Sequence, residues 1–368
     1  MQLFECQNCG QPLHFENTQC EACGHRLGYD PNQGTLLALT AEDNGWRAIA
    51  GDKGLYRLCA NAQHDACNWL VPADGDDQFC AACRHNRTVP DLTVPENLAN
   101  WRKLEAAKHH LFYTLLKLGL PLRTRAEDAD EGLAFDFLAD VQGENGIQAV
   151  MTGHDLGLIT ISLAEADDAE RERRRSQMHE PYRTLLGHFR HEIAHYFWDR
   201  LVRDTPMLAR CREVFGDESR DYAQALQEHY NNGPPAGWQQ SYVSTYATSH
   251  PWEDFAETWA HYLHLVDTLE TAHAFGIRVK PRIARAEELS TRVDIDPHYA
   301  STIDELMEPW IPLTVAINSI NRSMGQPDLY PFVLSPQVIT KLGFIHELIH
   351  ASSQQEAQAA AVPVEKAA

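Results

Sequence analysis

The placement of cysteine constrains this chain more than any other feature of its sequence. Eight of the nine cysteines precede residue 84, in or near Cys-x-x-Cys pairs, and only Cys211 lies beyond. A segment of 88 residues has little apolar core and depends on cross-links or metal to fold. In a chain that opens without an export signal, this clustering predicts metal sites rather than disulfides. Cys211 is expected to be an inert thiol in a packed environment.

The eight cysteines predict two structural zinc sites. Tetrahedral zinc requires four soft ligands that converge on one point, and two tight Cys-x-x-Cys turns supply them. The first site is expected to comprise Cys6, Cys9, Cys20 and Cys23, and the second Cys59, Cys67, Cys80 and Cys83. His64 is an alternative to Cys67 as a ligand. A thioredoxin-like redox pair is the rival interpretation, but no βαβ pattern surrounds these cysteines.

Charge and hydropathy narrow the function classes. The formal net charge is −21, which repels phosphate backbones and argues against nonspecific nucleic-acid binding. The first 88 residues carry 6 Lys and Arg against 11 Asp and Glu, so a protein partner is the better expectation for this module. No run of about 18 apolar residues exists to cross a membrane. The opening residues lack a secretory signal, so we expect a cytoplasmic protein.

Periodicity divides the chain into four parts. We expect a zinc-ribbon module over 1–88, a proline-containing linker over 89–97, a second domain over 98–352 and a flexible tail over 353–368. In the second domain, helical spacing predicts helices near 98–118, 181–202 and 251–272, and one that begins at Pro336. Alternation predicts strands at 133–138 and 158–163, the latter in a hairpin. The expected fold class is α+β, with a small mixed sheet beside several helices.

The predicted helix near 181–202 contains the motif His-Glu-x-x-His at 191–195. Residues four apart share one face of a helix, so His191 and His195 can bind one metal ion. Glu192 then lies beside a metal-bound water rather than on the metal. The complementary apolar stripe consists of Leu185, Phe189, Ile193 and Phe197.

A third ligand is available on the next predicted helix. Catalytic zinc takes three protein ligands and leaves one position for water. Glu253, Glu257 and His261 share one face of the helix that Pro251 opens. A second His-Glu-x-x-His motif at 346–350 has no such partner after it, and its apolar residues predict a packed terminal helix.

The order His-Glu-x-x-His, then Tyr-Ala-x-x-x-Pro-x-Glu-Asp-Phe-Ala-Glu, resembles zincin metallopeptidases with a glutamate ligand. More closely, the chain resembles a bacterial family of zinc-binding metallopeptidases with an amino-terminal zinc ribbon. The resemblance implies that Glu253 binds zinc and that Tyr246 assists the transition state. It favours Glu253 over Glu257, which then supports a ligand. The chain departs at Asp254 from one related zincin, which has phenylalanine there in a similar Glu-Phe-Phe-Ala-Glu segment.

These observations predict a zinc peptidase acting on a peptide or protein, with one catalytic and two structural zinc ions. Glu192 is the expected general base, and Tyr246 the donor to the oxyanion. The strand at 158–163 is expected to pair with extended substrate at a sheet edge. Two alternatives remain: a catalytically inactive zinc-stabilised binding or regulatory protein, and a non-haem metal enzyme that uses the same His-His-Glu site.

Overall fold

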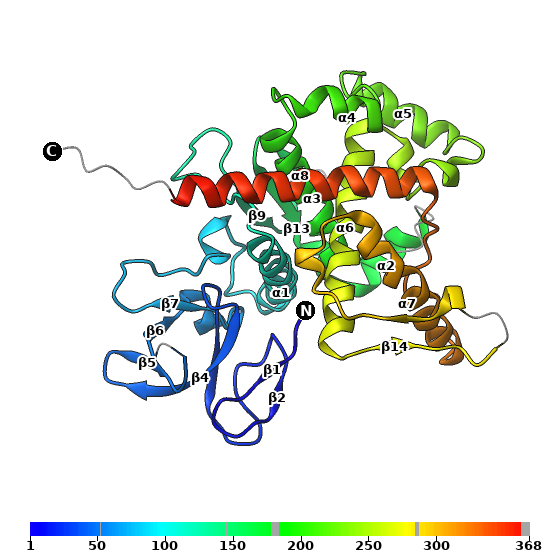
Figure 1. The fold of residues 1–368 in the computed structure, drawn as a ribbon. Coiled ribbons are helices and arrows are strands. Elements are labelled where there is room, and N and C mark those ends of the chain that lie inside the picture. Colours follow the sequence, from blue (N-terminus) through cyan, green and yellow to red (C-terminus); the bar gives the residue numbers. More distant parts are fainter. Residues whose placement is uncertain (52, 144–145, 178–183, 284–286, 362–368) are drawn as a thin grey trace. The chain divides into compact units, whose positions relative to one another are not determined.

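The computed structural model describes the chain except for residues 52, 144–145, 178–183, 284–286 and 362–368 (Figure 1). The described chain forms two compact units. Unit 1 comprises residues 1–117 and 122–171, and unit 2 comprises residues 118–121 and 172–368. Small sheets dominate unit 1 and helices dominate unit 2, so the fold class is α+β, as predicted.

Unit 1 begins with the expected zinc ribbon. A short hairpin, β1 (Phe4–Glu5) with β2 (Pro12–Leu13), precedes a five-stranded antiparallel sheet. The strands of this sheet follow one another in chain order: β3 (Arg26–Asp30), β4 (Thr35–Glu42), β5 (Gly45–Ala48), β6 (Leu55–Leu58) and β7 (Leu70–Pro72). Its apolar core includes Leu37, Leu39 and Leu70, each at most 2% exposed.

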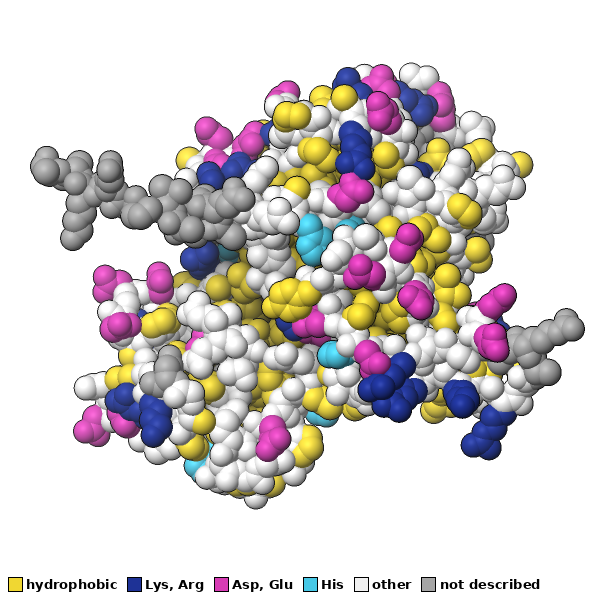
Figure 2. Space-filling model, in the orientation of Figure 1, with side chains coloured by type: hydrophobic (Ala, Val, Ile, Leu, Met, Phe, Trp, Pro, Cys, Tyr) yellow, Lys and Arg dark blue, Asp and Glu magenta, His cyan; other side chains and the backbone are white. Residues whose placement is uncertain are grey.

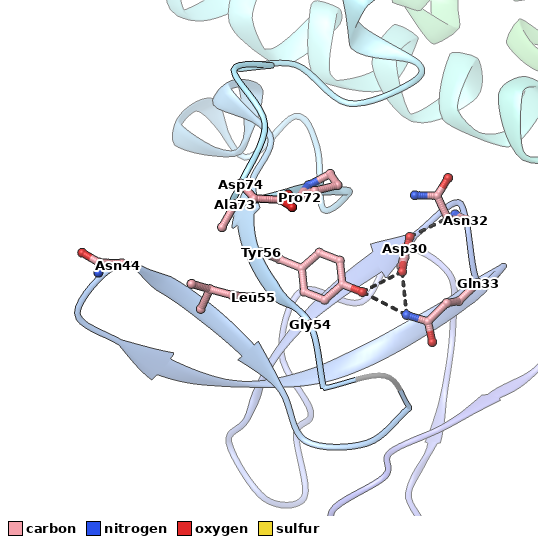
Figure 3. Close-up of a pocket in the computed structure, with 10 residues that line it drawn as sticks. All are labelled: Asp30, Asn32, Gln33, Asn44, Gly54, Leu55, Tyr56, Pro72, Ala73 and Asp74. Carbon is pink, nitrogen blue, oxygen red and sulfur yellow. Dashed lines mark hydrogen bonds between the residues drawn. The ribbon is translucent and has the colours of Figure 1, made fainter. Parts of the chain in front are cut away.

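A hollow of about 600 Å³ lies on this sheet (Figure 3). Three of its polar side chains are joined to one another, because the Tyr56 hydroxyl and the Gln33 amide both donate to the Asp30 carboxylate, at 3.0 and 2.7 Å. None of the predicted zinc ligands lines it. The hollow is therefore a feature of the ribbon's packing rather than of the predicted chemistry.

The rest of unit 1 consists of a long helix and a second sheet. Helix α1 (Pro95–Lys117) begins at the second proline of the predicted linker and ends before Gly119, whose φ of 66° favours glycine. The sheet has the order β12 (Gly153–Asp155), β13 (Leu158–Ser162), β9 (Ala134–Leu138) and β8 (Asn86–Thr88).

Strand β13 confirms one prediction and contradicts another. It forms the expected hairpin, with β12, through a turn at Leu156 and Gly157, whose φ values are both positive. However, β13 also pairs in parallel with β9, so both of its edges are occupied. The expectation that the strand at 158–163 offers a free edge to substrate is therefore wrong.

Unit 2 is helical, and three of its helices match the predicted ones. These are α3 (Leu185–Leu201), α6 (Pro251–Ala274) and α8 (Pro336–Ala361). The predicted opening of the first of them at Pro181 lies outside the described residues. Helix α8 continues through alanine- and glutamine-rich sequence as far as Ala361, because both residues are good helix formers. Helices α3 and α6 pack together, and α6 also packs against α8.

The remaining elements are shorter or lack a clear apolar period. The helices are α2 (Asp168–Gln177), α4 (Met207–Phe215), α5 (Tyr222–Asn232) and α7 (Ile303–Ser323), and the strands are β10 (Val141–Gly143), β11 (Gly146–Gln148), β14 (Arg278–Val279) and β15 (Thr291–Arg292).

The surface carries charge of both signs. On the face drawn in Figure 2, acidic side chains are scattered rather than gathered in one patch, and basic side chains lie among them. None of the described helices combines the length and the apolar character needed to cross a bilayer.

Candidate zinc centres

Helix α3 positions the first pair of candidate ligands. Its start is capped by Thr184, whose hydroxyl accepts a hydrogen bond from the Gly187 amide at 3.0 Å. Phe189, Ile193 and Phe197 of the predicted stripe are buried, at most 1% exposed, and anchor the helix in the core of unit 2. The anchored helix presents His191 and His195 on one face, with ring centroids 5.0 Å apart.

The first turn of α6 supplies the candidate carboxylate. The ring nitrogen Nδ1 of His250 caps this helix by accepting from the Trp252 amide at 3.1 Å. Because Nδ1 accepts, Nε2 carries the proton and donates to the Arg220 carbonyl at 3.1 Å. Pro251 occupies the first helical position, where its missing N–H costs nothing. The cap therefore fixes Glu253 in the first turn, directed at α3.

The two helices bring His191, His195 and Glu253 together. One ligand atom from each lies within 4.8 Å of the others, and all three residues are buried. Glu253 Oε2 lies 3.0 Å from His191 Nε2 and 3.7 Å from His195 Nε2. Zinc bonds of about 2.0–2.2 Å in a tetrahedron separate two ligand atoms by about 3.4 Å. The donor set therefore fits one zinc ion.

The environment keeps Glu253 ionised, which is the form that binds a metal. Burial raises the pKa of this carboxyl, but the charge and hydrogen bonds of the facing imidazoles outweigh burial and lower it well below its usual range. The other carboxylate oxygen, Oε1, accepts a hydrogen bond from the Tyr222 hydroxyl at 2.7 Å. The carboxylate is thus held on one side by α5 while the other side faces the imidazoles.

Glu257 lies one turn further along α6 and contacts the far side of His191. Its Oε1 is 2.7 Å from His191 Nδ1, while its Oε2 accepts from the Ser244 hydroxyl at 2.6 Å. Carboxylates that accept from the second nitrogen of a histidine orient metal-binding rings and raise their basicity. The arrangement places Glu257 behind a ligand rather than in the ligand set.

Glu192 lies on α3 between the two histidines, 6% exposed. His188 Nε2 is 3.2 Å from its Oε1. Burial raises the pKa of Glu192, but the hydrogen bond to His188 and the nearby imidazoles lower it on balance, so the carboxylate form is favoured. His188 thus contacts the expected general base rather than a metal ligand. Asp199 follows the motif on the same helix, and its Oδ1 lies 3.1 Å from Arg203 Nη1.

Two aromatic rings border the candidate ligands. Tyr246 lies in a 3-10 turn, η5 (Tyr246–Thr248), just before α6, with its ring centroid 5.8 Å from that of His191. Burial and the charge of Glu253 raise the pKa of Tyr246, so its hydroxyl keeps its proton. Trp252 packs on His195, with ring centroids 3.9 Å apart.

The remaining predicted residues of unit 2 are not brought to this centre. His261 lies two turns beyond Glu253, and its Nδ1 is 2.7 Å from the Tyr330 hydroxyl. Of the second His-Glu-x-x-His motif, His346 Nδ1 lies 2.9 Å from the Tyr262 hydroxyl, while Glu347 forms an ion pair with Arg210. Four apolar residues of this terminal helix are at most 1% exposed, so the helix is packed as predicted: Val338, Leu342, Ile345 and Ile349.

The ribbon brings its eight cysteines into two clusters of four. Cys6 and Cys23 are 3.6 Å apart at sulfur, as are Cys9 and Cys20. In the second cluster the sulfurs of Cys67 and Cys80 are 3.7 Å apart, and Cys59 and Cys83 complete the group. Zn–S bonds of about 2.3 Å in a tetrahedron separate two sulfurs by about 3.8 Å, so both clusters fit zinc.

The structure also decides between Cys67 and His64 as a member of the second cluster, and it shows the surroundings of the ninth cysteine, Cys211. Cys67, rather than His64, belongs to the second cluster; the His64 ring instead lies edge-on to Trp101, 6.0 Å away. Cys211 is buried on α4, and burial raises the pKa of its thiol to about 12. This thiol therefore stays protonated at neutral pH and is the packed residue that the sequence predicts.

Sequence reasoning missed the partners that orient the site. Tyr222 and Ser244 lie on other elements, and no spacing in the sequence links them to Glu253 or Glu257. His250 was visible directly before Pro251, but histidine is a rare helix cap. Only the fold reveals these three contacts.

Comparison with known proteins agrees with this geometry. Residues 97–348 match the family described as "Putative zinc-binding metallo-peptidase", and residues 3–94 match a zinc-ribbon domain. Proteins of Mycobacterium bovis and Mycobacterium tuberculosis, each named as uncharacterized, are 44% identical over 350 residues, or 95% of both chains. No solved structure matches the chain. The chain belongs to this zinc-binding metallo-peptidase family and carries an amino-terminal zinc ribbon.

Proposed function

We propose that this chain is a zinc-dependent peptidase that hydrolyses peptide bonds, with its catalytic metal held by His191, His195 and Glu253. One observation carries the proposal: a buried carboxylate oxygen of Glu253 faces the Nε2 atoms of both histidines, beside the carboxylate of Glu192. Two imidazoles and one carboxylate leave a fourth position open, which is the arrangement of catalytic rather than structural zinc.

When bound there, zinc lowers the pKa of a water molecule and polarises the carbonyl of the peptide bond. Glu192 accepts the proton of the attacking water and delivers it to the leaving amine. His188 holds the Glu192 carboxylate from the preceding turn of α3, at 3.2 Å. The base therefore has a fixed position and is ionised before substrate arrives.

Tyr246 is the proposed donor to the oxyanion of the transition state. Its raised pKa keeps the hydroxyl proton in place, which a hydrogen-bond donor requires. Tyr222 and Glu257 are positioning residues, because each contacts a proposed metal ligand and holds one side of it. The substrate is a peptide or protein, and its sequence preference is a matter for experiment.

The test compares wild type with Glu192→Gln on a mixed peptide library, with zinc supplied. Loss of a general base is expected to lower turnover about 100- to 10,000-fold. Glu347→Gln is the matched control, because Glu347 holds the same place in the second His-Glu-x-x-His motif but pairs with Arg210. The control should cleave as wild type does. If Glu192→Gln retains full turnover with its metal bound, the chain is not a peptidase of this mechanism.

A further inference from the structure

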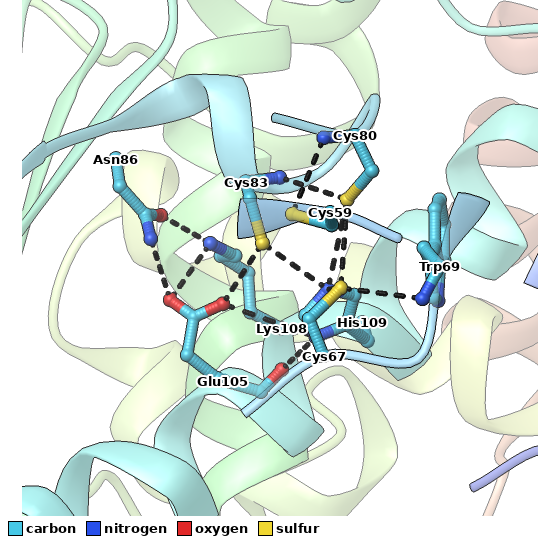
Figure 4. Close-up of polar contacts among 9 residues, drawn as sticks. All are labelled: Cys59, Cys67, Trp69, Cys80, Cys83, Asn86, Glu105, Lys108 and His109. Atoms are coloured by element: carbon cyan, nitrogen blue, oxygen red, sulfur yellow. Dashed lines mark hydrogen bonds and ion pairs between the residues drawn. The ribbon is translucent and has the colours of Figure 1, made fainter. Parts of the chain in front are cut away.

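The second cysteine cluster of the ribbon, Cys59 with Cys67, Cys80 and Cys83, is covered by polar residues of α1 (Figure 4). Glu105, Lys108 and His109 are at most 4% exposed, and they lie beyond residues 3–94, which match the zinc ribbon. A site of four cysteines needs none of them as ligands. Burying three ionisable side chains costs free energy unless each has a partner. Their contacts therefore indicate why these three residues are buried here.

His109 aims one ring nitrogen at three of the four sulfurs (Figure 4). Its Nε2 lies 3.2 Å from the sulfur of Cys67, 3.5 Å from that of Cys83 and 4.0 Å from that of Cys80. In a tetrahedral site with Zn–S and Zn–N bonds of about 2.3 and 2.0 Å, nitrogen and sulfur are about 3.5 Å apart. The nitrogen thus caps the three-sulfur face at ligand distance.

The other ring nitrogen fixes the tautomer. His109 Nδ1 lies 2.6 Å from the backbone carbonyl of Glu105, one turn earlier in α1. A carbonyl only accepts, so Nδ1 carries a hydrogen, and Nε2 is the nitrogen that faces the sulfurs. Metal-binding histidines are held in this way by a carbonyl or carboxylate.

The neighbouring side chains hold α1 in this position. Lys108 Nζ lies 2.9 Å from Glu105 Oε1, which also accepts from the Asn86 amide at 2.8 Å. Glu105 Oε2 is 3.6 Å from the sulfur of Cys83. Four thiolates around one divalent zinc leave a net charge of −2, and the buried ammonium of Lys108 offsets part of it.

We propose that His109 is an alternative ligand of the second metal centre. It takes the place of Cys59 when Cys59 is absent, and then binds the metal together with Cys67, Cys80 and Cys83. Cys59 is the one cysteine of the cluster with no hydrogen-bond-range contact to His109 among the described residues. The centre then has two overlapping tetrahedral sites, one made of all four cysteines and the other of three cysteines and the histidine. It retains its metal when Cys59 is lost.

The experiment counts metals on the full chain by native mass spectrometry and compares Cys59→Ala with the double variant Cys59→Ala and His109→Ala. The single variant should keep as many zinc ions as wild type, and the double variant should bind the last one about 10- to 100-fold more weakly. Cobalt difference spectra of the single variant should show three sulfur ligands and one nitrogen ligand.

The first centre provides the matched control. There a histidine ring nitrogen, His25 Nδ1, is 3.3 Å from one sulfur, that of Cys23. Cys9→Ala should therefore lower the zinc affinity of the first centre, because among the described residues no histidine there faces three sulfurs and takes the place of the lost cysteine. If Cys59→Ala loses its metal as readily as Cys9→Ala, the proposal is overturned. Retention that does not depend on His109 also overturns it, and makes His109 a hydrogen-bond donor to thiolates. Should the alanine variants fail to fold, cadmium NMR of Cys59→Ser reports the same donor set.

Discussion

At the scale of single residues, two of the three proposed ligands of the catalytic metal are held in place by a second residue. His191 is held by Glu257 at 2.7 Å, and Glu253 by the Tyr222 hydroxyl at 2.7 Å. Partners of this kind fix the direction of a ligand before metal arrives, which lowers the entropy lost on binding. The affinity of the site therefore depends on residues that never touch the metal.

Tyr222→Phe tests this dependence. The change removes one hydroxyl and leaves the ring in place, so Glu253 loses the hydrogen bond to Oε1 but remains buried. We expect zinc affinity at the catalytic site to fall about 10- to 100-fold, measured by competition with a chromogenic chelator. Tyr230→Phe is the control, because Tyr230 lies on the same helix and is 62% exposed. Unchanged affinity in Tyr222→Phe would show that the hydrogen bond does not orient the ligand.

The sequence predicted those residues whose separation a helix fixes. His191 and His195 are four apart, so the helical period alone places both on one face. Glu253 required the resemblance to known zincins, since Glu257 and His261 share its face of α6. Tyr222 and His109 could not be predicted, because each reaches its partner through the packing of elements that no local pattern relates.

At the scale of elements, α6 is the helix that positions most of the candidate site. Its first turn carries Glu253 and its second carries Glu257, while α3 packs along one side and α8 along another. On the α8 side, Asp254 Oδ2 lies 2.6 Å from Lys341 Nζ, with both side chains at most 8% exposed.

Lys341→Met is expected to destabilise the chain by about 1–3 kcal/mol. Burial already raises the pKa of Asp254 to about 7, so without the ammonium of Lys341 this carboxyl is buried in its neutral form and loses a hydrogen bond. Replacing both residues, as Asp254→Leu with Lys341→Met, should restore stability to near wild type, since an apolar pair of similar volume replaces a buried ion pair at little cost. Urea unfolding of the zinc-loaded proteins measures both. Equal destabilisation by the single and the double variant would mean that the ion pair itself is required.

Helices were predictable where the spacing of apolar residues agreed with the residues that start or stop a helix. Helices α1, α3, α6 and α8 have buried apolar stripes, and α1, α6 and α8 begin at proline. Helix α7 was missed because Pro309 and Pro312 lie inside it, and proline within a helical pattern predicts a break. The parallel pairing of β9 with β8 and β13 joins strands far apart in sequence, which alternation alone cannot specify.

At the scale of the whole molecule, the functional alternatives differ in metal content. Among its described residues the structure assembles three separate clusters: two of four cysteines, and one of two histidines and a glutamate. A further group, Cys83 with Glu105 and His109, shares Cys83 with the second cysteine cluster. Three centres of this kind imply a chain that carries metal in both of its compact units.

We expect three zinc ions per purified chain, measured by plasma mass spectrometry against protein concentration. The variant His191→Ala with His195→Ala should carry two, because it loses the ligands of the catalytic centre and leaves all eight ribbon cysteines in place. Two zinc ions in wild type would instead favour the inactive binding protein. Iron in the third centre would favour a non-haem metal enzyme.

The contact between α1 and the ribbon determines where the chain can be truncated. Phe15 and Trp69 of the ribbon rest on Tyr113 and His109, with ring centroids 5.3 and 5.2 Å apart. A fragment cut within residues 89–97 would therefore bare an aromatic surface to water, and such surfaces promote aggregation. Expression of the amino-terminal part should extend at least through Lys117, so that the aromatic rings keep their cover.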